Sequence, residues 1–184
     1  MSIQIGMGPS RVETEAAGMG IGRRLVVGIG DFAVSDNPAD TVVTHALGSC
    51  IAVCVFDPLA QVAGLLHILL PESRINPVRA KEQPAAFADT GIPMLFNAAY
   101  RLGAQKKRCV VHLIGGAEVT TSLASSATFD IGRRNILAAR NSLWRNGVLI
   151  KGESVGGSQV RTVHIDVARG AIQVTSGRET LAQL

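Results

Sequence analysis

One cysteine and one histidine are the residues of this chain best suited to do chemistry together. Cys50 follows Gly48 and Ser49, and His67 lies further along in an apolar segment. A histidine that takes the proton of a thiol creates a thiolate, which attacks amides and esters. Glycine lets the main chain bend, and a bend at Gly48 and Ser49 can direct main-chain N–H groups toward an oxyanion. These residues predict acyl transfer by a cysteine nucleophile.

The pair depends on a hairpin that places Cys50 beside His67. Residues 51–56 and 62–70 are apolar and flank an Asp-Pro turn, a pattern typical of two antiparallel strands. If the loop consists of residues 57–60, Cys50 lies directly opposite His67, with the Cβ atoms about 5 Å apart. A loop that is one residue longer or shorter would turn the two side chains to opposite faces.

A third residue should orient the imidazole. Thr44 lies in the β-branched segment 41–46, which leads into the glycine turn. Its hydroxyl or its main-chain carbonyl could accept a hydrogen bond from His67, which completes a Cys-His-hydroxyl arrangement. Each residue also has a structural explanation, because a cysteine or a histidine within apolar sequence is commonly part of the core.

A metal site is the rival interpretation, with Cys50, Cys54, His67, Cys109 and His112 as candidate ligands. Zinc ligands must lie about 2.0–2.3 Å from one ion. However, Cys50 and Cys54 are roughly 13 Å apart on an extended strand. Cys109 and His112 face opposite sides of theirs. We therefore expect no metal and no cofactor, and we expect Cys54 to be a core residue.

Composition limits the class of protein. The chain has 184 residues, of which 47% are hydrophobic and 17% charged, as in a single folded domain. No apolar run is long enough for membrane insertion, and three scattered cysteines fit a reducing, cytoplasmic setting. A net charge of +4 with one Trp and one Tyr does not favour nucleic-acid binding.

The pattern of apolar residues predicts a layered α/β domain of the α+β type, with a mixed, mostly antiparallel sheet and two main helices. We expect residues 1–22 to be a flexible tail and residues 23–184 to be one domain. We expect loops at 72–84 and 117–128, and helices at 86–102 and 131–147. The segments with strand character are 24–34, 41–46, 51–56, 62–70, 108–114, 148–151, 159–167 and 171–175.

Several motifs resemble the CheD family, the chemoreceptor glutamine deamidases of bacterial chemotaxis. The main matches are Thr-His-Ala-Leu-Gly-Ser-Cys at 44–50, Phe-Asp at 56–57, Gly-Leu-Leu-His at 64–67 and Leu-Pro at 70–71. Further matches are Phe-Ala-Asp-Thr at 87–90, Gly-Gly-Ala at 115–117, Ile-Gly-Arg-Arg-Asn at 131–135 and Gly-Gly at 156–157. The similarity extends from about residue 24 to about residue 176, with one departure at Val160, where the family has glycine before Arg161.

The resemblance implies that Cys50 is the nucleophile, His67 the base and Thr44 the residue that orients the imidazole. It implies a fold like that of the cytotoxic necrotizing factor deamidase domain. The implied substrates are glutamines on the cytoplasmic helices of methyl-accepting chemoreceptors. Some members of the family resemble methylesterases, and in some bacteria the partner is a CheC-type phosphatase. Two alternatives stay open: a non-catalytic module that binds the phosphatase or the receptor, and a hydrolase of small amides.

Overall fold

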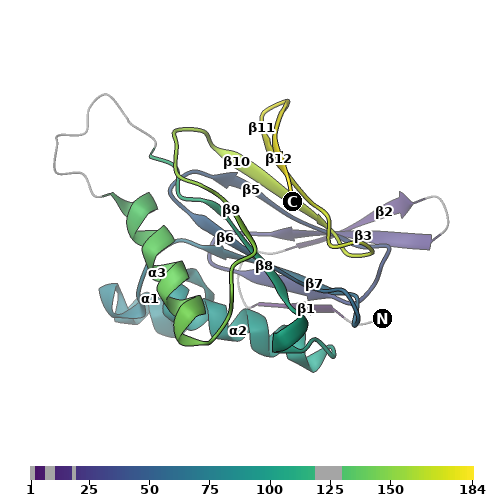
Figure 1. Cartoon of the computed structure of the whole chain (residues 1–184), viewed down its shortest axis with the longest axis horizontal. Coiled ribbons are helices and arrows are strands. Elements are labelled where there is room, and N and C mark those ends of the chain that lie inside the picture. Colours follow the sequence, from purple (N-terminus) through teal and green to yellow (C-terminus); the bar gives the residue numbers. More distant parts are fainter. Residues whose placement is uncertain (1–2, 7–10, 18–19, 119–129) are drawn as a thin grey trace.

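The chain folds into three layers, one of helices and two of stacked β-sheet (Figure 1). The structure is a computed structural model that describes residues 3–6, 11–17, 20–118 and 130–184. Its α-helices are α1 (Pro77–Glu82), α2 (Ala88–Arg101) and α3 (Ile131–Arg145). The 3-10 turns are η1 (Ser73–Ile75), η2 (Pro84–Ala86) and η3 (Lys106–Arg108). None of the described helices is long and apolar enough to cross a membrane.

The first sheet contains the hairpin. Its strands, in spatial order, are β1 (Ile3–Ile5), β4 (Phe32–Ser35), β7 (Val62–Ile68), β6 (Ile51–Asp57), β8 (Val110–Gly115) and β9 (Gly152–Val155). Of these neighbours only β8 and β9 run parallel. Strands β6 and β7 lie in the middle of the sheet, so the prediction of a central hairpin is confirmed.

The second sheet packs on the first. Its strands, in spatial order, are β12 (Glu179–Gln183), β11 (Ile172–Ser176), β10 (Arg161–Asp166), β5 (Thr41–Leu47), β3 (Gly20–Val27) and β2 (Arg11–Ala17). Only β3 and β5 are parallel neighbours here. The predicted fold class, a mixed and mostly antiparallel α/β domain with two main helices, is confirmed.

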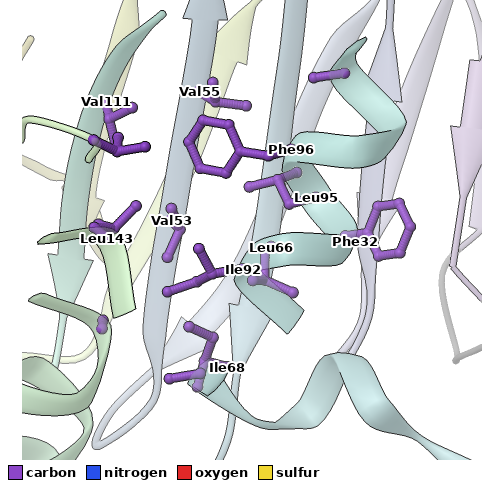
Figure 2. Close-up of a cluster of buried hydrophobic side chains, with 14 of the residues drawn as sticks. Phe32, Val53, Val55, Leu66, Ile68, Ile92, Leu95, Phe96, Val111 and Leu143 are labelled. Carbon is purple, nitrogen blue, oxygen red and sulfur yellow. The ribbon is translucent and has the colours of Figure 1, made fainter. Parts of the chain in front are cut away.

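Strand alternation divides the hairpin between two hydrophobic cores. Val53 and Val55 of β6 face the helices, where they form one core with residues of α2 such as Ile92 and Leu95 (Figure 2). Ala52 of β6 faces the other way, into the core between the two sheets. Because successive residues of a strand point to opposite faces, β6 can be apolar throughout and buried on both sides.

Helix α3 begins where the sequence predicted it. The side chain of Asp130 accepts a hydrogen bond from the main-chain N–H of Arg133, as an N-cap residue does. Helix α2 begins at Ala88 and continues through Pro93. Asp89 does not cap it, and instead accepts hydrogen bonds from the main-chain N–H and hydroxyl of Ser73.

Several predicted boundaries were wrong. Segment 24–34 is not one strand, because Gly30 turns the chain with a φ of 73° between β3 and β4, which belong to different sheets. The expected loop 72–84 contains η1 and α1, and η2 begins at its last residue, Pro84. Strand β9 lies after the expected strand 148–151, and β12 was not predicted. Most of the expected loop 117–128 lies outside the described residues.

The N-terminal segment also differs from the expected flexible tail. Strand β1 pairs with β4, and β2 pairs with β3. The described part of residues 1–22 is therefore largely strand, held by main-chain hydrogen bonds at the edges of the two sheets. The division of the chain at residue 22 stays a prediction.

Candidate active site

The register of the hairpin differs from the predicted one. His67 lies opposite Ala52, and Ile51 opposite Ile68. The predicted direct pairing of Cys50 with His67 is wrong, because the loop lies one residue later than expected. Asp57 still belongs to β6 and faces Val62.

The side chain of Asp57 explains the displaced loop. It accepts hydrogen bonds from the main-chain N–H groups of Leu59 and Ala60, and it forms a salt bridge with Arg108. These contacts hold Asp57 at the end of the strand, so that the turn forms after it. Gln61 completes the turn with a φ of 49°, a left-handed conformation that residues other than glycine adopt uncommonly.

Cys50 and His67 nevertheless lie on the same face of the sheet. The displaced loop moves each pairing by two residues, and a shift of two preserves the face to which a side chain points. Cys50 immediately precedes β6 and belongs, like Ala52, to the core between the sheets. It is therefore a diagonal neighbour of His67, a relationship with Cα atoms about 7–8 Å apart that long or aromatic side chains can bridge.

Thr44 reaches His67 from the facing sheet. Its Oγ1 lies 2.7 Å from Nδ1 of His67 and 2.8 Å from the carbonyl oxygen of Val27. A hydroxyl has one hydrogen, and the carbonyl can only accept. Thr44 therefore donates to Val27 and accepts from the N–H at Nδ1 of His67. The sequence left open whether the hydroxyl or the carbonyl of Thr44 would act, and the structure selects the hydroxyl.

This hydrogen bond sets the tautomer of the imidazole. With the hydrogen on Nδ1, the Nε2 atom of His67 carries a free lone pair. Nε2 is buried and has no hydrogen-bond partner in the described part of the chain. The main chain of His67 is fixed by a hydrogen bond from its N–H to Asp31 and by another from the N–H of Gly30 to its carbonyl. The free lone pair of His67 is therefore held in one orientation.

Burial keeps both members of the pair neutral at rest. Cys50 is 7% exposed and His67 1% exposed. Loss of solvation raises the pKa of the Cys50 thiol to about 11 and lowers the pKa of His67 to about 4. At neutral pH the free site therefore contains a thiol and an uncharged imidazole. The hypothesis of a resting thiolate does not fit these values.

A second loop supports the turn that precedes Cys50. The N–H of Gly116 donates to the carbonyl of Cys50 (2.7 Å), and the N–H of Ala117 donates to that of Gly48 (2.8 Å). Gly115 has a φ of 113°, and a Cβ at this position would lie 2.3 Å from the carbonyl oxygen of Cys50. Only glycine fits such a close approach. The turn and this loop therefore form one packed unit.

Asn135 contacts the main chain beside Cys50 and near His67. The sequence assigned it no role beyond its place in the family motif. Its Nδ2 donates to the carbonyl of Ser49 (2.9 Å) and to that of Leu69 (3.0 Å). Sequence did carry a signal, since position 135 falls on the buried stripe of α3 together with Ile136 and Ala139. A polar residue on such a stripe requires hydrogen-bond partners.

The remaining candidates lie elsewhere. Cys54 is buried in the core between the sheets, where loss of solvation raises its pKa. Within the part of the chain that the structure describes, no group of three or more His, Cys, Asp or Glu side chains could hold a metal ion. The ring centroid of His164 lies 6.1 Å from that of His45.

Comparison with known proteins yields consistent matches. A family model described as "CheD chemotactic sensory transduction" matches residues 69–176. The chain is 48% identical over 160 residues to the probable chemoreceptor glutamine deamidase CheD 1 of Syntrophus aciditrophicus. The aligned region covers 87% of this chain and 98% of the relative. It is 43% identical over 149 residues to the corresponding protein of Solibacter usitatus (81% and 86% covered). It is 36% identical over 148 residues to that of Thermococcus kodakarensis (80% and 89%).

Proposed function

The chain belongs to the CheD family, and from this premise we propose that it deamidates glutamine side chains of chemoreceptors with Cys50 as nucleophile and His67 as base. The observation that carries the proposal is the hydrogen bond from Nδ1 of His67 to Thr44. It leaves Nε2 as a proton acceptor on the face of the sheet that also carries Cys50.

The first half of the reaction forms a thioester. As the sulfur of Cys50 attacks the carboxamide carbon, the thiol proton passes to Nε2 of His67 and the carbonyl oxygen becomes an oxyanion. The imidazolium then gives this proton to the departing amine, so that ammonia leaves as the C–N bond breaks. The enzyme now holds the receptor through a bond between Cys50 and the glutamyl carbonyl.

The second half releases glutamate. A water molecule loses a proton to Nε2 of His67 as its oxygen attacks the thioester carbon. The C–S bond then breaks, and the thiol of Cys50 recovers the proton. Throughout, the Thr44 hydroxyl accepts a hydrogen bond from Nδ1, which stabilises the ring when it carries the positive charge.

The oxyanion requires hydrogen-bond donors, and the sequence suggested the turn at Gly48 and Ser49. The N–H of Gly48 already donates to the carbonyl of Ala46 (3.0 Å). For the main-chain N–H of Cys50, no acceptor is found among the residues that the structure describes. We therefore propose the N–H of Cys50, together with that of Ser49, as the donors.

The neutral state of Cys50 and His67 before substrate binds determines when the proton moves between them. Because a separate ionisation of Cys50 is disfavoured by burial, proton transfer to His67 accompanies attack on the substrate. We propose that the bound receptor enables this step by placing its glutamine carbonyl against the turn at Gly48 and Ser49. A thiol of this kind reacts slowly with small electrophiles, because its proton must pass to His67 during the attack.

The wider setting follows from the proposed substrate. The cytoplasmic helices of methyl-accepting chemoreceptors would place the reaction in the cytoplasm. A CheC-type phosphatase is the partner that we propose from the family resemblance, and receptor methylesterase activity would use the same thioester chemistry. A non-catalytic module that binds the receptor or the phosphatase is the second candidate, and the burial of Cys50 favours it.

Mass spectrometry of the cognate receptor distinguishes these candidates. Incubation with this protein should raise the mass of particular receptor peptides by about 1 Da for each glutamine converted to glutamate, with release of one ammonia. Receptor alone is the control. Unchanged receptor mass despite stable binding would contradict deamidation and support the binding module. Release of ammonia from free glutamine would instead indicate a hydrolase of small amides.

A further inference from the structure

We propose that Asn135 is a positioning residue that keeps Cys50 in register with His67, an inference that rests on the proposed function. Asn135 lies on α3 and is fully buried. Its two hydrogen bonds end on the main chain beside each member of the catalytic pair. Ser49 directly precedes Cys50, and Leu69 lies two residues after His67.

The location of these contacts relative to the hairpin supports the inference. The paired register of β6 and β7 ends at Ile51 and Ile68. Cys50 therefore lies just beyond the last pair, where the ladder no longer fixes one strand against the other. The amide of Asn135 connects the two strands at this point, through one N–H to each side. It takes the place of the hydrogen bonds that a longer ladder would provide.

The orientation of the Asn135 amide follows from its partners. Both contacts are carbonyl oxygens, and only the NH2 group of the amide can donate to two acceptors. The other end of the amide, Oδ1, is buried and has no hydrogen-bond partner in the described part of the chain. A buried acceptor without a partner costs free energy. A leucine would fill the same space without this cost, so the role of Asn135 lies in its two donors.

The main-chain segments that Asn135 connects are themselves held by hydrogen bonds. The carbonyls of Cys50 and Gly48 accept hydrogen bonds from Gly116 and Ala117, and Leu69 donates its N–H to the carbonyl of Ala86 (2.9 Å). Helix α3 approaches closely because residue 132 is glycine, at which a Cβ would lie 2.6 Å from the carbonyl oxygen of Gly116. Asn135 therefore fixes the main chain beside Cys50 and the main chain beside His67 relative to helix α3.

Replacement of Asn135 tests the inference through the split between kcat and KM. Asn135→Leu should lower kcat for receptor deamidation about 10- to 100-fold, the effect expected of a displacement of about 1 Å. Its KM should stay within about twofold of the original value, because Asn135 is buried and does not reach the receptor. Asn141→Leu, at an exposed position of the same helix, is the matched control and should leave both constants unchanged.

A second measurement needs no receptor and distinguishes positioning from general loss of structure. The rate of Cys50 alkylation by iodoacetamide at pH 7 should fall in Asn135→Leu and in His67→Asn. The double variant should react no more slowly than His67→Asn alone, because both changes remove the same coupling. Thermal unfolding establishes that each variant is folded, and Asn135→Ala replaces Asn135→Leu if the latter does not fold.

The outcomes separate the inference from the function on which it rests. An unchanged kcat in Asn135→Leu, or alkylation losses that multiply in the double variant, would overturn the positioning role and leave deamidation intact. A protein that shows the non-additive alkylation but leaves the receptor mass unchanged would retain the positioning role and contradict the proposed function.

Discussion

Cys50→Ala should lower receptor deamidation by about 10⁴-fold or more, since loss of a covalent nucleophile leaves only binding and oxyanion stabilisation. The replaced group is one buried sulfur, so the fold should survive with a modest loss of stability. Ammonia release and the mass gain of receptor peptides, both measured over a fixed time, report the effect. Binding of the receptor should persist, because the change does not alter the protein surface beyond a 7% exposed side chain.

Cys54→Ala is the matched control for this experiment. Cys54 belongs to the same core between the sheets as Cys50 and is 1% exposed. The substitution removes the same atom from the same core, four residues further along the chain. It should retain most of the activity. Full activity in Cys50→Ala, or an equal loss in Cys54→Ala, would mean that the thiol of Cys50 does not perform the reaction.

His67→Asn should lower kcat about 10³-fold at neutral pH, within the range expected for loss of a general base. Asparagine can place an N–H near the position of Nδ1 and so keep a hydrogen bond to Thr44, but it has no counterpart of Nε2. The variant therefore removes the base while it preserves the contact between the two sheets. Near-normal activity in this variant would exclude proton transfer to His67.

The pH dependence of activity distinguishes His67→Asn from the original protein more clearly than its activity at a single pH. Burial lowers the pKa of His67 to about 4 and raises that of Cys50 to about 11. Between pH 6 and pH 9 both groups are neutral in the active form, so the original protein should show a nearly constant kcat/KM. His67→Asn must rely on the thiolate, whose fraction rises about tenfold per pH unit below its pKa. Its activity should rise accordingly.

Thr44→Val should lower the activity less than His67→Asn does. Valine has nearly the shape of threonine but cannot accept the hydrogen bond from Nδ1, so the tautomer of His67 is no longer fixed. Activity should fall to a value between those of the original protein and His67→Asn. Thr44→Ser, which restores the hydroxyl, should recover most of it. The sequence left open whether the hydroxyl or the carbonyl of Thr44 acts, and the contact between Oγ1 and Nδ1 favours the hydroxyl.

Local patterns predicted the central hairpin and the faces of its residues but not its register. The apolar runs 51–56 and 62–70 and the Asp-Pro turn are visible in the sequence. The register depends on contacts made by Asp57 with Arg108, which is distant in sequence. A pattern of period two determines which face a residue occupies, so an error of two residues left Cys50 and His67 on one side of the sheet.

The edges of both sheets were the least predictable part of the fold. Strands such as β1 and β12 lie at edges, where apolar side chains such as Ile3 and Leu181 are only partly buried against the core. Such strands need no long apolar run, and the sequence predicts a tail for residues 1–22. The helices were easier, because α3 carries both a cap at Asp130 and a regular buried stripe.

The neutral state of Cys50 and His67 could not be derived from residue types. Cysteine followed at a distance by histidine suggests a preformed ion pair, yet protonation depends on how completely each group is buried. That burial comes from the packing of the second sheet over the hairpin. The position of Asn135 beside the pair is likewise a product of tertiary structure, since α3 lies far from residues 49 and 69 in the chain.

The central claim is that Cys50 becomes acylated by the receptor, and peptide mass mapping after rapid acid quenching tests it most directly. The unaltered protein is the suitable form, since it retains the imidazolium that protonates the departing ammonia, and rapid acid quenching stops hydrolysis of the thioester. We expect a receptor peptide joined to the peptide that contains Cys50, with the mass of ammonia lost and sensitivity to hydroxylamine. Receptor deamidated under these conditions with the adduct on Cys54 or Cys109, or on no cysteine, would contradict the account.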